Sequence, residues 1–168
     1  MSAPSITFER VDWFDERAVA LREAMDAESG RAYAELMRAQ SAETNAAIAA
    51  AFAIDASVFL DCVLAIDESG TAIGHASLRP WLDELEVKKV FVAPAARGRG
   101  VSRALMTELE RLARGRGIQS LVLQTGVLQV PAIRLYESMG YEPIEVYGKY
   151  SVVPFALCFR KSLTLDEQ

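Results

Sequence analysis

The first third of the chain changes from a strand pattern to a helix pattern. Residues 6–11 alternate apolar and polar side chains, which predicts a β-strand. Residues 15–27 place apolar side chains at helical spacing, and residues 31–52 are rich in Ala, Glu, Leu, Met and Gln, which favour helices. We therefore expect a strand, a helix, and then one long or broken helix.

Three strands are expected next. Residues 58–66 and 71–78 are apolar runs, and the sequence Asp67-Glu68-Ser69-Gly70 between them indicates a hairpin turn. Residues 85–92 form another strand pattern, which ends at Ala93-Pro94. The middle of the chain is therefore predicted to be a hairpin followed by a third strand.

Helix and strand patterns alternate after this point. Apolar residues at helical spacing follow Gly100, and Gly115 and Gly117 end that helix. Residues 118–125 have a continuous apolar centre, as expected for a strand that is covered on both faces.

The last part of the chain predicts one more helix and two strands. Pro131 stands where a helix can begin and Gly140 where it can end. Residues 141–147 and 152–161 then read as the final strands. The order β-α-α-β-β-β-α-β-α-β-β predicts an α/β fold. No repeat or linker divides the chain, so residues 1–168 are expected to form a single domain.

Composition narrows the function classes. A chain of 168 residues can bury one core of its own. Its net charge of -5 argues against a general nucleic-acid binder, which would need a basic face. Cys62 and Cys158 lie far apart, which favours two buried thiols in a reducing compartment. With one His and no Cys/His cluster, no metal site is expected.

The sequence also favours a cytoplasmic protein without a membrane segment. The N-terminal residues 1–7 have neither a basic start nor an apolar run, so no signal peptide is expected. The longest apolar stretch, 46–54, is too short to span a bilayer. Its apolar face could equally serve the core or a homodimer.

The loop before the helix that follows Gly100 is the first chemical signal. A strand runs into Arg97-Gly98-Arg99-Gly100, and the loop opens a helix. Free N–H groups and the positive dipole end at a helix start bind phosphate, and glycines let the anion approach. The two arginines add charge beside it. Taken alone, the loop could also be a plain helix entry with surface arginines.

Two other phosphate-binding loops do not fit this segment. A P-loop ends in Gly-Lys-Ser/Thr, which is absent. The Rossmann pattern needs a small residue where this chain has Arg103. A nucleotide-binding domain built on the same loop is therefore a poor interpretation.

Two segments together resemble the GNAT superfamily of acyl-CoA-dependent N-acetyltransferases. Arg97-Gly98-Arg99-Gly100-Val101-Ser102 resembles the family's Arg/Gln-x-x-Gly-x-Gly/Ala signature. Ala132-Ile133-Arg134-Leu135-Tyr136-Glu137-Ser138-Met139-Gly140-Tyr141 looks like its A-x-x-L-Y-E-x-x-G-F/Y helix. The motifs occur in the family's order, and the resemblance covers residues 58–145 well. It implies a mixed central sheet of about seven strands with helices on both faces.

The resemblance also implies where acetyl-CoA binds. Strands 85–92 and 118–125 would splay apart, with the pantetheine arm in the gap and the pyrophosphate on the loop amides. The residues that the resemblance assigns to this co-substrate are Val90, Phe91, Val92, Arg97, Gly98, Arg99, Gly100, Val101, Ser102, Gln129, Ala132 and Leu135.

This chain departs from the family pattern at two places. Ser102 stands where the family prefers Gly or Ala, but serine is small and caps helices well. Gln129 and Pro131 stand before Ala132, where many members carry an Asn that holds the pantetheine arm.

Direct attack of an amine on the thioester, which the resemblance implies, needs a base and an acid. Glu86 has the spacing before Arg97 that the base glutamate has in the histone-acetylating branch, and Glu84 is the fallback. Glu86 could instead be a solvated strand residue or a partner for Lys88 or Lys89. Tyr136 matches the family's proton donor to the departing thiolate; it could also be an interior tyrosine with a satisfied hydroxyl.

The sequence says little about the acceptor. Arg79, before Glu86, could grip an acceptor carboxylate bidentately, or it could be a surface arginine at a turn. His75 lies in the middle of an apolar strand, so a buried, hydrogen-bonded side chain is expected there. The aromatic and basic candidates for acceptor contact, each of which could also be packing, are Trp13, Tyr33, Arg79, Trp81, Tyr147 and Tyr150.

The leading interpretation is thus an N-acetyltransferase that uses acetyl-CoA and a primary amine of a small metabolite or amino acid. A protein N-terminus or lysine is the alternative acceptor. A CoA-binding module without catalytic activity is the alternative of another class. No metal, nucleic acid or membrane is expected to take part.

Overall fold

The computed structural model describes residues 5–164, and within them the strands form one seven-stranded sheet of order β1-β2-β3-β4-β5-β7-β6. Met1–Pro4, part of the segment without an expected signal peptide, lie outside the described residues. The strands are β1 (Thr7–Arg10), β2 (Asp61–Ile66), β3 (Ala72–Trp81), β4 (Glu84–Val92), β5 (Ser120–Gly126), β6 (Glu142–Ile144) and β7 (Ala156–Ser162). The α-helices are α1 (Glu16–Ala39), α2 (Ala42–Phe52), α3 (Val101–Gly115) and α4 (Val130–Ser138).

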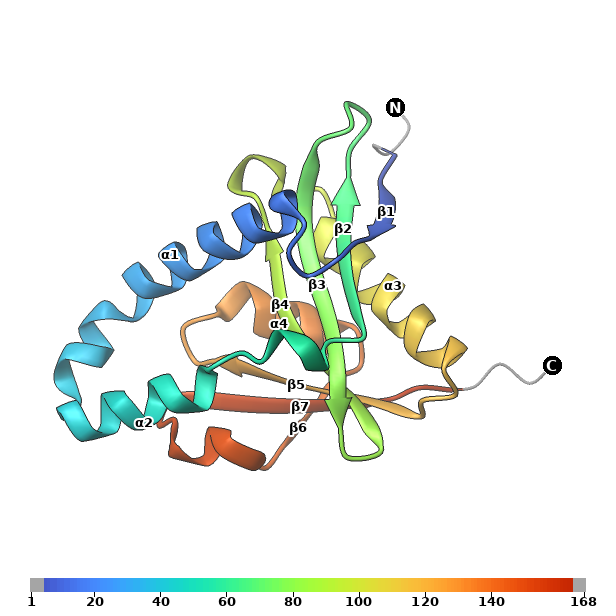
Figure 1. Cartoon of the computed structure of the whole chain (residues 1–168). Helices are drawn as coiled ribbons and strands as arrows, with labels where there is room; N and C mark the ends of the chain where they lie inside the picture. The colour runs from blue at the N-terminus through green and yellow to red at the C-terminus, as the bar shows by residue number, and fades with distance from the viewer. Residues whose placement is uncertain (1–4, 165–168) are drawn as a thin grey trace.

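Helices cover both faces of the sheet, as the resemblance implied (Figure 1). α3 and α4 share the largest core cluster with one face, where Leu105, Met106 and Leu109 of α3 are fully buried. Gly74 of β3 permits this close packing, because a Cβ there would lie 2.9 Å from Leu105 Cδ1. α1 packs on the opposite face through Ala18 and Leu21. The predicted element order and fold class are confirmed.

The helical segment is broken later than the sequence pattern suggested. α1 continues through Gly30, a residue that weakens a helix interior by only about 1 kcal/mol. The break comes at Gln40, which has extended backbone angles. Ser41 then caps α2, and its side chain accepts a hydrogen bond from the Thr44 N–H at 3.0 Å.

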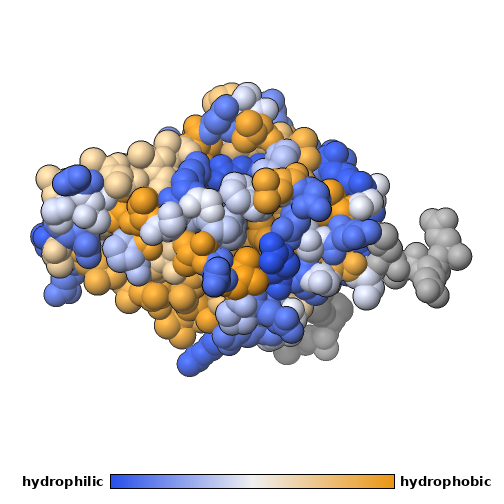
Figure 2. Space-filling model, turned by 90° about the horizontal axis from the view of Figure 1, so that it is seen from below, coloured by the Kyte–Doolittle hydropathy of each residue, from blue (hydrophilic) through white to orange (hydrophobic). Residues whose placement is uncertain are grey.

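α2 uses its apolar face in the core. Ile48 and Ala51 are buried against Tyr150 and Val153. The surface seen from below also has more apolar residues on the side toward α2 than on the opposite side (Figure 2). The predicted apolar face of this helix therefore contributes to the interior.

Two predicted strands are shorter than their apolar runs. The run that begins at Val58 starts its strand only at Asp61, because residues Ala56–Val58 form a 3₁₀ turn capped by Asp55. The strand predicted from Val152 begins at Ala156, since Gly148–Val152 form another 3₁₀ segment, η3. Packing of η3 against α2 stabilises this conformation, and such a long-range contact cannot be recognised from the local apolar pattern.

A bulge in β4 separates it from β5. The β3–β4 register passes from Ser77↔Lys88 to His75↔Phe91, so two residues of β4 lie opposite one of β3. Lys89, inside the bulge, has a φ of 58°. Parallel pairing of β4 with β5 covers only Leu85–Val87 and Leu121–Leu123. β5 pairs with β7 along its length instead, and the expected splay of β4 and β5 is confirmed.

Candidate functional site

A cavity of about 370 Å³ lies at the splay. One side is formed by β4, β5 and α4, and the other by α1, α2 and Phe155. Of the residues predicted to hold the co-substrate, Val90, Gln129 and Ala132 line it. Phe91, Val92 and Leu135 pack in the hydrophobic clusters beside the cavity.

The loop before α3 leaves a row of amides free. Gly98 and Gly100 have φ angles of 77° and 75°, which only glycine adopts easily. A Cβ at either glycine would meet no atom within 4 Å, so this side of the backbone is open. Among the described residues, no acceptor is found for the N–H groups of 98–100, and those of 101–103 are the unpaired donors of the first helical turn.

The cap of α3 differs from the expectation for Ser102. Gly100 is the N-cap residue, and no side chain caps this helix. Ser102 lies inside the first turn, so its side chain does not cap α3 as expected. The free amides of that turn are therefore available to an anion.

The two loop arginines are not equivalent. Arg97 contacts Glu28 of α1 at 2.7 Å, and its Nε donates to the Val92 carbonyl at 3.0 Å. Its charge is thus partly compensated within the protein. Arg99 is exposed beside the same amides.

Tyr136 projects from α4 into the wall of the cavity. It is 6% exposed, and no hydrogen-bond partner for its hydroxyl exists in the described part of the chain. No backbone or side-chain group among residues 5–164 therefore engages this hydroxyl, and the role of Tyr136 stays a prediction. Burial raises the pKa of Tyr136 to about 12, so the hydroxyl keeps its proton at neutral pH.

Glu86 lies behind the cavity, where it is 1% exposed. Its Oε1 accepts a hydrogen bond from Arg79 Nε at 2.6 Å, and its Oε2 accepts one from the Tyr147 hydroxyl. The Tyr150 hydroxyl also donates to Oε1, at 3.3 Å. Glu86 is therefore not a solvated strand residue. Its ion-pair partner is Arg79, which β3 places directly opposite, and not Lys88 or Lys89. Arg79 is 9% exposed and is not a surface arginine.

Glu84, the fallback base, is held at the far end of β4. Arg160 contacts both of its carboxylate oxygens at 2.8 Å, and the Ser120 hydroxyl donates to it at 2.6 Å. The hydrogen bond from Arg160 lowers the pKa of Glu84. This carboxylate is committed to joining β4, β5 and β7.

The predicted acceptor residues fall into two groups. Tyr33 lines the cavity, and its hydroxyl accepts a hydrogen bond from the Leu128 N–H at 3.1 Å. The Trp81 ring packs at a tilt against Tyr147, with 5.0 Å between ring centroids, and the Tyr147 hydroxyl reaches the Arg79–Glu86 pair. The residues outside the cavity lining, whose predicted contact with the acceptor stays a prediction, are Trp13, Arg79, Trp81, Tyr147 and Tyr150.

Lys88 is the cavity residue that the sequence analysis missed. It is 9% exposed and lines the cavity, and its Nζ donates to the Tyr150 hydroxyl at 2.9 Å. Burial lowers the pKa of Lys88 to about 8. The period-two alternation of β4 places Lys88 on the same face as Glu86, and this signal could have indicated it.

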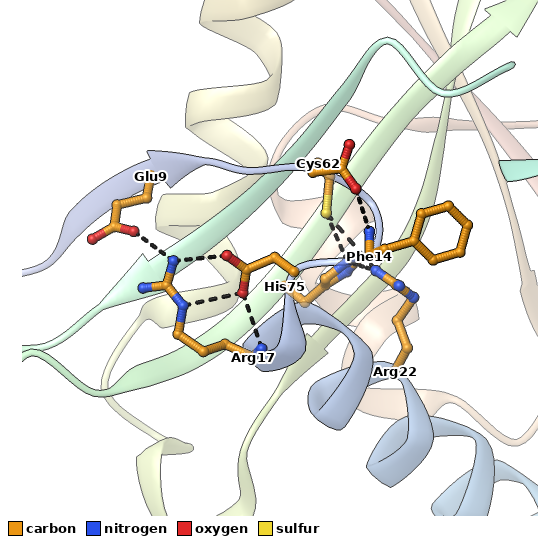
Figure 3. A network of polar contacts seen from close by, with 8 residues as sticks. Glu9, Phe14, Arg17, Arg22, Cys62 and His75 are labelled. Carbon is orange, nitrogen blue, oxygen red and sulfur yellow. Dashed lines mark hydrogen bonds and ion pairs between the residues drawn. The ribbon is translucent and has the colours of Figure 1, made fainter. Parts of the chain in front are cut away.

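A second buried polar cluster lies on the α1 face of the sheet (Figure 3). His75 is fully buried and donates from Nδ1 to the Lys89 carbonyl at 2.8 Å, so Nε2 is left as an acceptor for Arg22 at 3.0 Å. Cys62 Sγ lies 3.2 Å from the same Nε2. The expectation of a buried, hydrogen-bonded His75 is confirmed. Arg22 also covers the Trp13 ring at 3.8 Å, so Trp13 packs in this cluster.

The described residues hold no group of three or more His, Cys, Asp or Glu side chains that could bind a metal ion. Both cysteines are buried and free. Within residues 5–164, no helix has the length and apolar character needed to cross a bilayer.

Comparisons with known proteins point to one protein family. The sequence model of the acetyltransferase (GNAT) family matches residues 19–141. An IAA acetyltransferase from Azospirillum brasilense is 40% identical over 78 residues, which cover 46% of this chain and 51% of that protein. The chain thus spans about half the length of this relative.

Solved structures share the fold over nearly the whole chain. A GNAT family acetyltransferase from Elizabethkingia anophelis with acetyl-CoA bound has a TM-score of 0.65 and 16% identity, covering 94% of this chain and 98% of that one. The ribosomal-protein-S18-alanine N-acetyltransferase from Escherichia coli has a TM-score of 0.64 and 17% identity, covering 98% and 97%. At these identities the likeness shows the fold alone.

Proposed function

Because the chain belongs to the acetyltransferase (GNAT) family, we propose that it transfers an acetyl group from acetyl-CoA to a primary amine of a small metabolite or amino acid. The observation that carries this proposal is the cavity at the β4–β5 splay. This cavity lies between the wall formed by β4, β5 and α4 and the wall formed by α1 and α2. Donor and acceptor can therefore meet in one space, as direct attack in a ternary complex requires.

The donor end is supported by two features. The amides that follow Arg97 are free to bind the pyrophosphate, and the positive end of α3 favours an anion there. Beyond Val87 the edge of β4 has no pairing with β5, so its backbone can pair with the pantetheine arm. The Elizabethkingia anophelis relative with acetyl-CoA bound supports the same co-substrate.

Tyr136 is proposed as the proton donor to the departing thiolate. Its hydroxyl faces the cavity, holds its proton, and has no competing partner among residues 5–164. A thiolate that leaves into this cavity would receive a hydrogen bond and then a proton from it.

Glu86 is proposed as the final proton acceptor, which the proton reaches through other side chains or water. Its carboxylate does not line the cavity, but the Tyr150 hydroxyl donates to it and accepts from Lys88, which does. A proton released by the acceptor amine could thus travel along these hydrogen bonds or through water. The chain contains one continuous polar path from the cavity to a buried carboxylate.

A thiol-release assay with acetyl-CoA and a panel of amines tests the proposal, combined with calorimetric titration of CoA. Acceptor-dependent thiol release would support it. CoA binding without turnover on any amine would favour a non-catalytic module. A complete lack of affinity for CoA would overturn the assignment.

A further inference from the structure

Lys88 is an unbalanced charge inside the cavity. The other charged lining residues are Lys89 and Asp26, which pair with each other at 3.0 Å. The Asp26 side chain is 65% exposed, so this pair lies at the surface. In the described part of the chain, no carboxylate forms an ion pair with Lys88.

The nearest acid does not neutralise Lys88. Glu86 already pairs with Arg79 at 2.6 Å, and these two charges cancel. Tyr150 stands between that pair and Lys88, and its hydroxyl accepts hydrogen bonds from Arg79 and Lys88 at 2.9 Å each. The cluster of Arg79, Glu86, Lys88 and Tyr150 therefore carries one net positive charge at neutral pH.

Lys88 also has unused hydrogen-bonding capacity. An ammonium group has three N–H donors, and the Tyr150 hydroxyl accepts one of them. No acceptor for the other two exists among residues 5–164. A buried charge of this kind is costly unless an opposite charge or a hydrogen-bonding group joins it. The depressed pKa of Lys88 reflects that cost.

The rest of the acceptor side is largely apolar. Its α1 and α2 wall includes Met25, Met37, Ile48 and Phe52, and Phe155 closes it from the C-terminal part of the chain. Among residues 5–164, Asp26 is the one acidic lining residue, and it is paired with Lys89 at the surface. The wall suits an apolar skeleton, with one place for a negative group.

We propose that Lys88 binds the carboxylate of the acceptor, and that the acceptor is an apolar amino acid or a closely related amine that bears a carboxylate. This inference rests on the proposed function and names its substrate class. One ammonium with two free donors matches the single charge and two oxygens of a carboxylate, whereas a phosphate would leave negative charge uncompensated. Lys88 therefore takes the role that the sequence suggested for Arg79, whose guanidinium is engaged by Glu86.

Matched acceptors test the proposal. Acetyl transfer to L-phenylalanine and L-leucine is compared with transfer to phenethylamine and isoamylamine, which lack the carboxylate. Wild-type kcat/KM should favour the amino acids by about tenfold or more, because a charge-assisted hydrogen bond is lost with the amines. Lys88→Met should bring the ratio of kcat/KM for each amino acid over its matched amine to about one, even where loss of the proton path through Lys88 lowers transfer to both kinds of acceptor. Equal loss with both kinds of acceptor would show that Lys88 serves the chemistry instead, and would overturn the proposal.

Two further variants control for folding and charge. Lys149→Met makes the same chemical change in η3, outside the cavity, and should keep the preference. Lys88→Arg keeps the positive charge and should keep part of the preference. CoA titration and the melting temperature show that each variant is folded.

A binding measurement separates this inference from the proposed function. Titration of 3-phenylpropionate into the CoA-saturated wild-type protein should give a Kd about tenfold or more below that of 3-phenylpropan-1-ol. This difference does not depend on turnover. Equal binding of acid and alcohol would overturn the carboxylate site even if amines are acetylated, and acid binding without any transfer would overturn only the proposed activity.

Discussion

Arg79 and Glu86 face each other across β3 and β4, and their side chains meet at 2.6 Å in the interior. Both are at most 9% exposed. Two charges in such a place are tolerated because each compensates the other, and removal of one leaves the other buried without a partner. The pair thus fixes the wall of the site behind Lys88.

Glu86→Gln should therefore destabilise the fold strongly. We expect a loss of about 3 kcal/mol in the free energy of unfolding, since Arg79 keeps its charge without a counterion. Chemical denaturation measures this loss. The double variant Arg79→Met/Glu86→Leu should recover most of it, and a double variant as unstable as Glu86→Gln would contradict the charge argument.

Tyr136→Phe should reduce turnover and spare co-substrate binding. The phenyl ring keeps the packing against Tyr141 and Phe159, while the hydroxyl that faces the cavity is lost. We expect kcat to fall by about 10²-fold or more, which is the size of a general-acid contribution. Tyr141→Phe is the matched control, because its hydroxyl is bound to Glu110 outside the cavity. Equal kcat in Tyr136→Phe and wild type would remove Tyr136 from the mechanism.

Lys88→Met should change the pH dependence of stability. The pKa of Lys88 falls from 10.5 to about 8 on folding, through burial first and then through the neighbouring charges of Arg79, Lys89 and Lys149, against the opposing effect of Glu86. Below pH 8, Lys88 is charged in both the folded and the unfolded state, so folding includes the full free-energy cost of burying that charge. Between pH 8 and 10.5 the unfolded chain binds more protons, so this group's contribution to stability rises with pH.

The variant should accordingly be more stable than wild type near neutral pH, by at most about 3 kcal/mol, and the difference should shrink as the pH rises. Loss of the hydrogen bond to Tyr150 offsets part of the gain. Denaturation of both proteins at a series of pH values measures the difference. A difference that stays constant across that series would contradict the depressed pKa.

Gly126→Ala should disturb the cavity, because a Cβ at this position would overlap the Tyr33 hydroxyl. Tyr33 would have to move away from β5 and lose its hydrogen bond from Leu128. We expect a destabilisation of about 1–3 kcal/mol, as is typical of overpacking. Gly30→Ala is the matched control, since a Cβ there meets nothing within 4 Å and alanine favours the helix, so its melting temperature should rise.

Gly100→Ala should weaken CoA binding. The residue has a φ of 75°, and an L side chain there strains the loop that presents the free amides. We expect the Kd for CoA to rise by about tenfold. Gly70→Ala imposes similar strain in the β2–β3 turn, at a φ of 83°, and should leave the Kd unchanged. Equal Kd values for Gly100→Ala and wild type would contradict the proposed phosphate site.

The sequence by itself determined the order of the elements and the place of the Arg97–Gly100 loop. Alternation along β4, helical spacing along α3 and the glycines between them are properties of neighbouring residues. Their physical cause is local, because side-chain period and allowed φ angles depend on a few adjacent positions. The Tyr136 helix was recognisable for the same reason, through its motif.

Only the tertiary structure decided which side chains share the cavity. Lys88 reaches it because β4 bulges and leaves β5, Arg79 is engaged because β3 places it opposite Glu86, and Tyr33 arrives from α1 against Gly126. η3 forms between the two last predicted strands and delays the second one to Ala156, and α2 packs on it. Each of these contacts joins residues far apart in the chain or depends on how strands diverge. The free energy that selects them comes from burial and charge pairing between segments, which no local pattern encodes.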